Sequence, residues 1–361
     1  MRLMFVYYCY GDAGSAQDIH HYTRVARDLG HEVLVYGPPD PGSSFSFSRD
    51  VESVDALIFV FEWTTELRHG DRLDLARLLT RVPRSRRIVI DCDGAYNEPL
   101  SVNGDYNHRE AAASRAWIET CDSIADRIYQ PTRSPVRPNV GTFFFHGYDP
   151  AWERPLDFGT KEFGMVYVGH SKFRWGPMEH VLQAIEPVRA QVGRIGLVGH
   201  GWDTPPPWAG PMGIADVYYT DQAYLRGMGV EFHPPVPFEE VIPWMSRAVI
   251  NPVIYRPLFS RLRLVTCRTF ETPAAGTIPL FGLERAYVRD IFGNDADALV
   301  LPEEHAEEKI SDIMRDPEKY ADIVLGIRRH LAARHSYTAR LRQLLELVRG
   351  LTATVTGEPL P

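Results

Sequence analysis

Two carboxylates flank a cysteine directly after a short apolar run. The run at residues 87–91 ends in Asp91, and Cys92, Asp93 and Gly94 follow it. Clustered carboxylate oxygens bind Mg²⁺ or Mn²⁺, and an Asp-x-Asp-Gly sequence can also carry a phosphatase nucleophile. No Gly-Asp-x-x-x-Asp follows later in the chain, which argues against the phosphatase. We therefore favour a strand end that is structural or faces a substrate.

Basic side chains follow another apolar run, at residues 163–168. Lys172 and Arg174 come shortly after Gly169, which ends this run. Such cations are either solvated surface charges or ligands of a phosphate group, where they would stabilise negative charge. Both interpretations stay open.

A glycine-rich loop follows the first apolar run, at residues 3–9. The loop contains Asp12 and Gly14, and the helical periodicity of residues 15–29 begins directly after it. Asp12 either caps this helix or faces a cleft. His20 is either exposed, satisfied in the core, or part of a substrate site.

Apolar runs alternate with segments of helical periodicity along most of the chain. The predicted strands lie at residues 3–9, 32–36, 56–61, 87–91, 163–168, 194–198, 230–233, 248–250 and 278–281. The predicted helices lie at 15–29, 72–79, 178–192, from about 269, and at 306–314, 317–335 and 337–349. This alternation indicates parallel sheets with crossover helices.

Five prolines between residues 131 and 155 interrupt the alternation and mark a linker. The sequence thus predicts an α/β protein with two Rossmann-like, doubly wound domains that face an interdomain cleft. In such sheets, ligands bind beyond the carboxyl ends of the strands.

The composition is that of a globular protein that acts on small molecules. The 361 residues are 44% hydrophobic and 24% charged, and the chain is long enough for two domain cores. The net charge of -8 gives no electrostatic attraction to nucleic acid. No apolar run reaches the roughly 18 residues of a membrane span, and the start lacks the layout of a signal peptide. The four cysteines show no paired spacing, so we expect buried thiols in a cytoplasmic protein.

The segment from Arg268 to Thr277 resembles the donor-site segment of GT-B glycosyltransferases of group 1 (family 4-like). The loop and helix from Gly14 to Val33 resemble the first loop and helix of the same enzymes. The bacterial CgeB-like subgroup is most similar, through Gly-His-Gly-Trp at 199–202, the segment 234–241, Ile-Asn-Pro at 250–252 and the tail segment 335–341. The resemblance covers most of residues 160–348 and, more weakly, residues 1–40.

The resemblance implies a hexosyltransferase with the GT-B fold. Such an enzyme moves a sugar from a nucleotide-diphosphate donor to a soluble small-molecule or glycan acceptor, with retention of configuration and without a metal or another cofactor. We expect an acceptor domain at residues 1–148, a donor domain at 149–336, a helix at 337–349 that returns to the first domain, and a disordered tail at 350–361.

Three sets of site residues follow from the resemblance. The catalytic cations, which would stabilise the leaving diphosphate, are Lys172, Arg174 and Arg268. The donor-binding residues are Glu271, on the ribose hydroxyls, with Gly276, Thr269, Val236, Pro237, Asn251 and Gly169. The acceptor-binding residues are Asp12, Gly14, His20 and Asp93.

One residue departs from the family pattern. Arg263 stands where the family often has the first of two glutamates, so the identity of the residue that contacts the sugar stays open.

One alternative function is a non-catalytic nucleotide-sugar or surface-layer binding protein on the same fold. Another is a metal-dependent Asp-x-Asp transferase of the GT-A type. An inverting enzyme would need a base, with Asp12, His20 or Asp93 as candidates.

The predicted partners are a nucleotide-sugar donor and an acceptor. We predict no nucleic-acid partner and no transmembrane segment. The arginine-rich helical region at 327–349 is either a solvated face or a weak membrane-surface contact. The sequence does not determine the oligomeric state.

Overall fold

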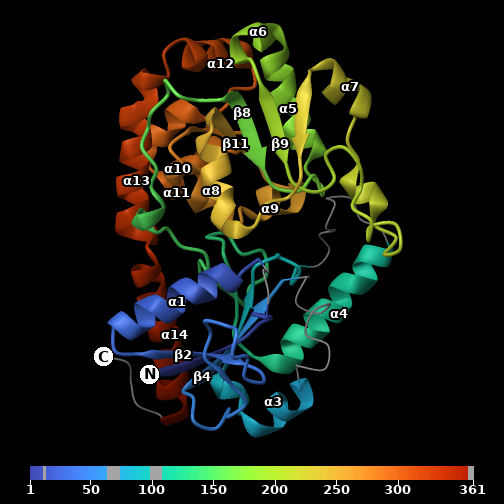
Figure 1. The fold of residues 1–361 in the computed structure, drawn as a ribbon. Coiled ribbons are helices and arrows are strands. Elements are labelled where there is room, and N and C mark those ends of the chain that lie inside the picture. The colour runs from blue at the N-terminus through green and yellow to red at the C-terminus, as the bar shows by residue number, and fades with distance from the viewer. Residues whose placement is uncertain (11–13, 63–73, 98–107, 357–361) are drawn as a thin grey trace. The chain divides into compact units, whose positions relative to one another are not determined.

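The computed structural model describes residues 1–10, 14–62, 74–97 and 108–356, and it divides into two compact units (Figure 1). Unit 1 consists of residues 1–147, 261–266 and 335–361, and unit 2 of residues 148–260 and 267–334. The chain crosses between the units after residues 147, 260, 266 and 334, whereas the predicted donor domain at 149–336 is one continuous stretch.

Unit 1 is built on a parallel sheet of apolar strands. The strand order is β3-β2-β1-β4-β5-β6-β7, with register pairs such as Phe5 with Ile58. The strands are β1 (Arg2–Val6), β2 (Glu32–Tyr36), β3 (Phe47–Ser48), β4 (Ala56–Phe61), β5 (Arg87–Asp91), β6 (Ile128–Gln130) and β7 (Val140–Thr142). The order reverses between β1 and β4, which is the switch point where doubly wound sheets bind ligands.

Within the described residues of unit 1, the α-helices are α1 (Ala16–Asp28), α3 (Leu75–Arg81), α4 (His108–Ile124) and α14 (Tyr337–Thr356). Helix α14 packs against α1 with the predicted apolar stripe, whose four residues Leu341, Leu344, Leu345 and Val348 are all buried. The helix continues to Thr356, so the predicted helix end at residue 349 is wrong. The chain has no proline between these two positions to stop the helix.

Unit 2 is a second doubly wound domain, with a parallel sheet in the order β10-β9-β8-β11-β12. Its strands are β8 (Phe163–Val168), β9 (Ile195–Val198), β10 (Val230–His233), β11 (Ala248–Val253) and β12 (Ile278–Phe281). The order reverses between β8 and β11, so the switch point of this unit lies at the ends of these two strands.

Nine α-helices of unit 2 lie within the described part of the chain. They are α5 (Trp175–Ile185), α6 (Arg189–Val192), α7 (Gln222–Gly227), α8 (Phe238–Ser246), α9 (Pro257–Leu262, which ends in unit 1), α10 (Cys267–Ala274), α11 (Arg285–Phe292), α12 (Ala306–Arg315) and α13 (Ala321–His335). The single helix predicted at 178–192 is in fact two, because Pro187 lies in a 3-10 turn between α5 and α6. Of the helices in the described ranges, none has the length and apolarity to cross a membrane.

The short segment 261–266 belongs to unit 1, although the chain on both sides of it belongs to unit 2. The backbone N–H of Val265 donates to the carbonyl of Pro131 at 2.7 Å, and the Thr132 hydroxyl donates to the carbonyl of Leu262 at 2.6 Å. Gly94 lies against the segment 261–266, since a Cβ at Gly94 would stand 2.7 Å from Leu262 Cδ1. Arg263, which replaces the family glutamate, lies in this segment with φ of 50°.

Candidate functional site

Four cationic side chains meet at the switch point of unit 2. Two lie in the loop after β8, one follows β11, and one lies in the first turn of α10; we call Lys172, Arg174, Arg256 and Arg268 the cation cluster. Three of them were predicted as catalytic cations. Arg256 was missed because strand β11 was predicted to end at residue 250, whereas it continues to Val253 and delivers Arg256 to the carboxyl edge of the sheet.

His170 lies among these cations. Arg174 Nη1 is 2.8 Å from His170 Nδ1. Burial lowers the pKa of His170 well below its usual value, and the charges of Arg174, Arg256, Lys172 and Arg268 lower it further. The imidazole is therefore neutral at pH 7, and it can accept a hydrogen bond from Arg174 while adding no charge of its own.

Lys172 and Arg256 are buried, and Arg174 and Arg268 are half-buried. Lys172 is 7% exposed, and the Nε of Arg174 is buried without a hydrogen-bond partner. A buried cation is costly unless an anion or hydrogen bonds compensate it. The arrangement therefore favours a bound anion with several oxygen atoms, such as a diphosphate.

Arg268 is also tied to Glu271 within α10. Arg268 Nε donates to the carbonyl of Val168 at 2.9 Å, and its Nη1 forms an ion pair with Glu271 Oε2. Glu271 is 2% exposed. The predicted ribose ligand thus holds a predicted catalytic cation in place.

Four more predicted donor residues lie beside the cluster or at the same edge of the sheet. Gly169 follows β8, and its carbonyl accepts a 2.7 Å hydrogen bond from Trp202 Nε1. Thr269 hydrogen-bonds through its hydroxyl to Tyr255, which follows β11. Val236 and Pro237 follow β10 at the same edge of the sheet.

Two predicted donor residues lie elsewhere in unit 2. Gly276 comes between the end of α10 and the start of β12, and a Cβ there would stand 2.4 Å from the carbonyl oxygen of Pro155. Position 276 requires glycine, because its φ is 70° and the neighbouring backbone leaves no room for a Cβ atom. Asn251 lies inside β11 and donates to Met245 O and Thr277 Oγ1, at 2.8 and 2.9 Å. These contacts give both residues a structural role, Gly276 in close backbone packing and Asn251 in hydrogen bonds to Met245 and Thr277.

Two of the predicted acceptor residues, Gly14 and Asp93, lie near Glu62 in unit 1. Gly14 lies against Glu62, since a Cβ there would stand 2.8 Å from Glu62 Oε2. Asp93 acts electrostatically on Glu62. His20 is exposed on α1, with its ring centroid 6.0 Å from that of Phe45. Asp12 lies outside the described residues.

Glu62 is at the centre of a second polar site, at the switch point of unit 1. It follows β4, and its carboxylate accepts hydrogen bonds from Tyr7, at 2.5 Å, and from the Ser15 hydroxyl. Burial is the main cause that raises the pKa of Glu62, followed by the charge of Asp93. Glu62 was missed as a site residue, although its position directly after an all-apolar strand is a signal that the sequence contains.

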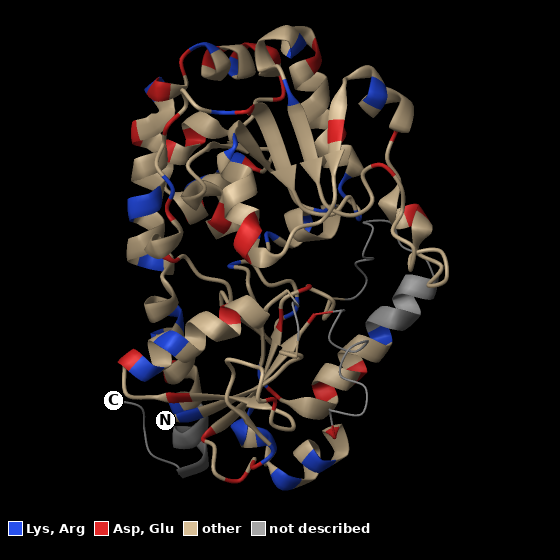
Figure 2. Ribbon diagram, viewed as in Figure 1, with Lys and Arg blue, Asp and Glu red and all other residues tan. Residues whose placement is uncertain are grey.

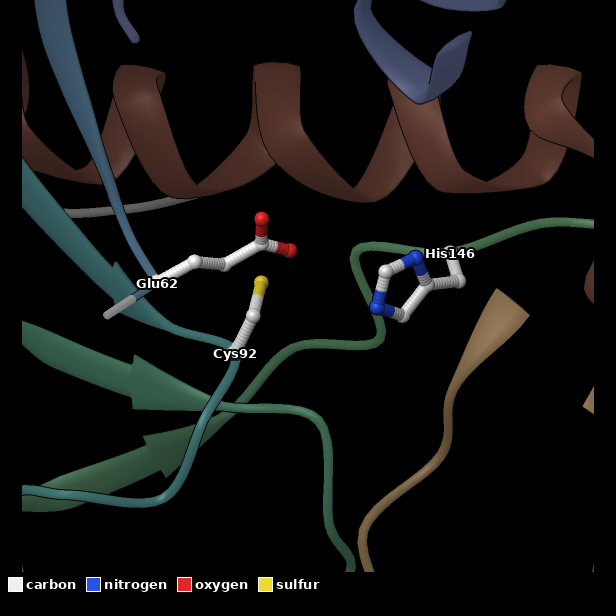
Figure 3. Close-up of side chains that lie close together, drawn as sticks. All are labelled: Glu62, Cys92 and His146. Carbon is white, nitrogen blue, oxygen red and sulfur yellow. The ribbon is translucent and has the colours of Figure 1, made fainter. Parts of the chain in front are cut away.

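Cys92 and His146 complete this second site (Figure 3). Their ligand atoms and that of Glu62 all lie within 4.8 Å of one another. The other such group among the described residues, His305 with Glu307 and Glu308, is largely exposed. The thiols of Cys9, Cys92 and Cys121 are buried as predicted, whereas Cys267 is partly exposed.

The comparisons with known proteins agree with this architecture. A family model described as glycosyl transferase-like matches residues 179–346, which is just under half of the chain. A search of the curated proteins found no match.

Solved structures of glycosyltransferases are similar along nearly the whole chain. T4 phage β-glucosyltransferase is 12% identical, with 96% of this chain and 99% of that chain covered and a TM-score of 0.57. Sucrose-phosphate synthase from Thermosynechococcus elongatus is 14% identical, with 98% of this chain and 100% of that chain covered and a TM-score of 0.61. The chain has the GT-B glycosyltransferase fold. This confirms the predicted fold class.

A third similar structure with the GT-B fold is an α-glucosyltransferase in complex with UDP and a 13-mer DNA. It is 14% identical, with 96% of this chain and 98% of that chain covered and a TM-score of 0.62. At these identities the likeness concerns the fold.

Proposed function

We propose that the protein is a glycosyltransferase that moves a sugar from a nucleotide-diphosphate donor to an acceptor. The observation that carries this proposal is the cation cluster. It lies at the switch point of the unit that contains most of the match to the glycosyl transferase-like family. T4 phage β-glucosyltransferase, which shares the GT-B fold, has been solved with its UDP-glucose substrate.

The cluster would act on the leaving group. When the bond between the sugar C1 and the phosphate oxygen breaks, negative charge develops on the diphosphate. Preorganised cations lower the barrier by stabilising that charge. Arg174 and Arg256, from opposite sides of the switch point, would bind the phosphate oxygens, and Glu271 would keep Arg268 oriented beside them.

We also propose retention of configuration, on the basis of the resemblance of residues 268–277 to retaining enzymes. The acceptor hydroxyl would then form its bond to C1 on the face that the diphosphate leaves. The departing phosphate oxygen takes the hydroxyl proton, so no side-chain base is needed. The CgeB-like subgroup and the cytoplasmic location are further proposals from the sequence.

The donor chemistry should not need a divalent ion. The cation cluster supplies the charge that Mg²⁺ or Mn²⁺ supplies in an Asp-x-Asp enzyme. The Michaelis constant for the donor should therefore be the same with and without added Mg²⁺ or Mn²⁺. A Michaelis constant that falls steeply when either ion is added would favour the metal-dependent alternative.

The proposal is tested by calorimetry with UDP, GDP and dTDP. We expect one of them to bind, and Arg256→Gln to weaken its affinity by about 10- to 100-fold, because a hydrogen bond to a charged group contributes about 1.5–3 kcal/mol. Arg226→Gln, an exposed arginine of α7, is the matched control and should bind like the wild type. If the wild type binds none of the three nucleotides, the proposal is wrong.

The alternative function is a nucleotide-sugar or surface-layer binding protein without catalysis, which Arg263 at the family's glutamate position favours. Incubation with the nucleotide sugars distinguishes the two. An enzyme releases free nucleotide diphosphate slowly even without an acceptor, whereas a binding protein leaves the donor intact.

We propose a small molecule or a glycan as the acceptor. Gly14 and Asp93 are the predicted acceptor contacts that lie together in unit 1.

A further inference from the structure

Three side chains of different chemistry converge at the carboxyl edge of the unit 1 sheet. Glu62 follows β4, Cys92 follows β5, and His146 lies in the loop after β7. Figure 3 shows the Cys92 sulfur directed at the Glu62 carboxylate, with the His146 ring facing both from the other side. One ligand atom from each lies within 4.8 Å of the other two.

A second layer of residues orients these groups. Asp18 Oδ2 lies 3.1 Å from His146 Nδ1, and Asp18 Oδ1 accepts a 2.7 Å hydrogen bond from Tyr337. A carboxylate on one ring nitrogen fixes the tautomer of a histidine that ligates a metal through the other. Tyr7 donates to Glu62 Oε2 and the Ser15 hydroxyl donates to Glu62 Oε1, and these two hydrogen bonds fix the orientation of the carboxylate.

Several carboxylates lie around the Cys92 sulfur, and the buried Arg340 donates from Nε to the His146 carbonyl at 3.4 Å. Besides Glu62, the carboxylates of Asp18, Asp91 and Asp93 act on the Cys92 sulfur. Cys92 and His146 are 4% and 6% exposed, so water screens these charges little. A buried cation is the complement that such an environment stabilises.

We propose that Glu62, Cys92 and His146 bind a divalent transition metal of the zinc class. Thiolate, imidazole and carboxylate together form a donor set that zinc prefers, and hard ions such as Mg²⁺ avoid the sulfur. Three protein ligands leave the fourth tetrahedral position to an oxygen ligand such as water. This proposal concerns unit 1 alone and does not depend on the proposed glycosyltransferase function.

The test is a titration of the full, reduced, chelator-treated protein with Co²⁺, followed by displacement with Zn²⁺. We expect one equivalent of Co²⁺ and a near-ultraviolet band from charge transfer between thiolate and cobalt. Cys92→Ser should abolish the band. Asp18→Asn, which changes only the outer layer, should weaken the affinity by about 10- to 100-fold. Cys121→Ser and Cys267→Ser are the matched controls and should bind like the wild type.

A second measurement uses the wild type alone, in case Cys92→Ser does not fold. X-ray absorption at the zinc edge of the loaded wild type should show one sulfur ligand at about 2.3 Å together with nitrogen and oxygen ligands at about 2.0–2.2 Å. The proposal is overturned if the wild type gives no thiolate band and no stoichiometric Zn²⁺ binding. It is also overturned if a folded Cys92→Ser variant keeps the band.

Discussion

His170 is a neutral side chain surrounded by cations, and this makes the stability of the protein depend on pH. Burial and the charges of Lys172, Arg174, Arg256 and Arg268 lower its pKa in the folded state. The unfolded value is about 6.5, so the unfolded chain binds the proton first as the pH falls. The stability that neutral His170 confers is complete above about pH 7.5 and is lost progressively as the pH falls through about 6.5.

Urea unfolding of the wild type and His170→Gln between pH 8 and pH 5 tests this prediction. The wild type should lose stability toward pH 5 more steeply than His170→Gln, which cannot be protonated there. His305→Gln, which changes an exposed histidine, should follow the wild-type profile. Parallel profiles for the wild type and His170→Gln would contradict the predicted role of His170.

Single residues were predictable where local pattern and strand ends coincide. Lys172, Arg174 and Arg268 follow a strand or begin a helix in the sequence, and the structure brings all three together around His170. The Arg268–Glu271 ion pair was not foreseen, although a spacing of three residues in a helix permits it. His146 carried no local signal, because it follows a strand of only three residues.

At the scale of elements, helix α14 should be indispensable to unit 1. Its apolar stripe packs on α1, and the ring of Tyr337 stacks on His21 at a centroid distance of 4.4 Å. Leu344 is 0% exposed, so Leu344→Ala should lower the free energy of unfolding by about 2–5 kcal/mol. Chemical denaturation measures this loss.

The matched control is Leu325→Ala in α13, where the leucine is 37% exposed. It should change stability by less than about 0.5 kcal/mol. Removal of residues 336–361, which includes all of α14, should abolish cooperative unfolding of unit 1. A truncated protein that unfolds like the wild type would show that α14 contributes nothing to unit 1.

Elements were predicted well where the sequence pattern was long and continuous. The strands at 32–36, 56–61, 87–91, 163–168, 230–233 and 278–281 were predicted with the observed bounds. The missed strands β3, β6 and β7 have only two or three residues, too few for an apolar period to emerge. Helix α8 was missed because Pro243 lies inside it, against the local preference of proline.

The charge of the whole molecule bears on the choice of acceptor. Figure 2 shows Lys and Arg interspersed with Asp and Glu along helices of both units. The net charge is -8, and DNA binding requires cations that neutralise phosphates. We therefore expect no binding to duplex DNA, in contrast to the α-glucosyltransferase solved with DNA.

Fluorescence anisotropy of a labelled duplex at low salt measures this. No saturable binding should occur at protein concentrations of about 10 µM, although nonspecific DNA-binding proteins bind in the range of about 1 to 100 µM. Saturable binding that weakens steeply with added salt would make DNA a candidate acceptor.

The segment 261–266 affects how the gene of this protein can recombine with those of its relatives. A crossover usually exchanges one contiguous stretch of coding sequence, but neither unit is encoded by one stretch. An exchange of codons 148–334 would also import foreign residues at Leu262, Leu264 and Val265, which are 1%, 0% and 0% exposed. These imported side chains would have to fit the core of the recipient's unit 1, whose other residues had diverged separately. Chimeras that keep the recipient's codons 261–266 should therefore be the ones that survive, in the laboratory and in evolution.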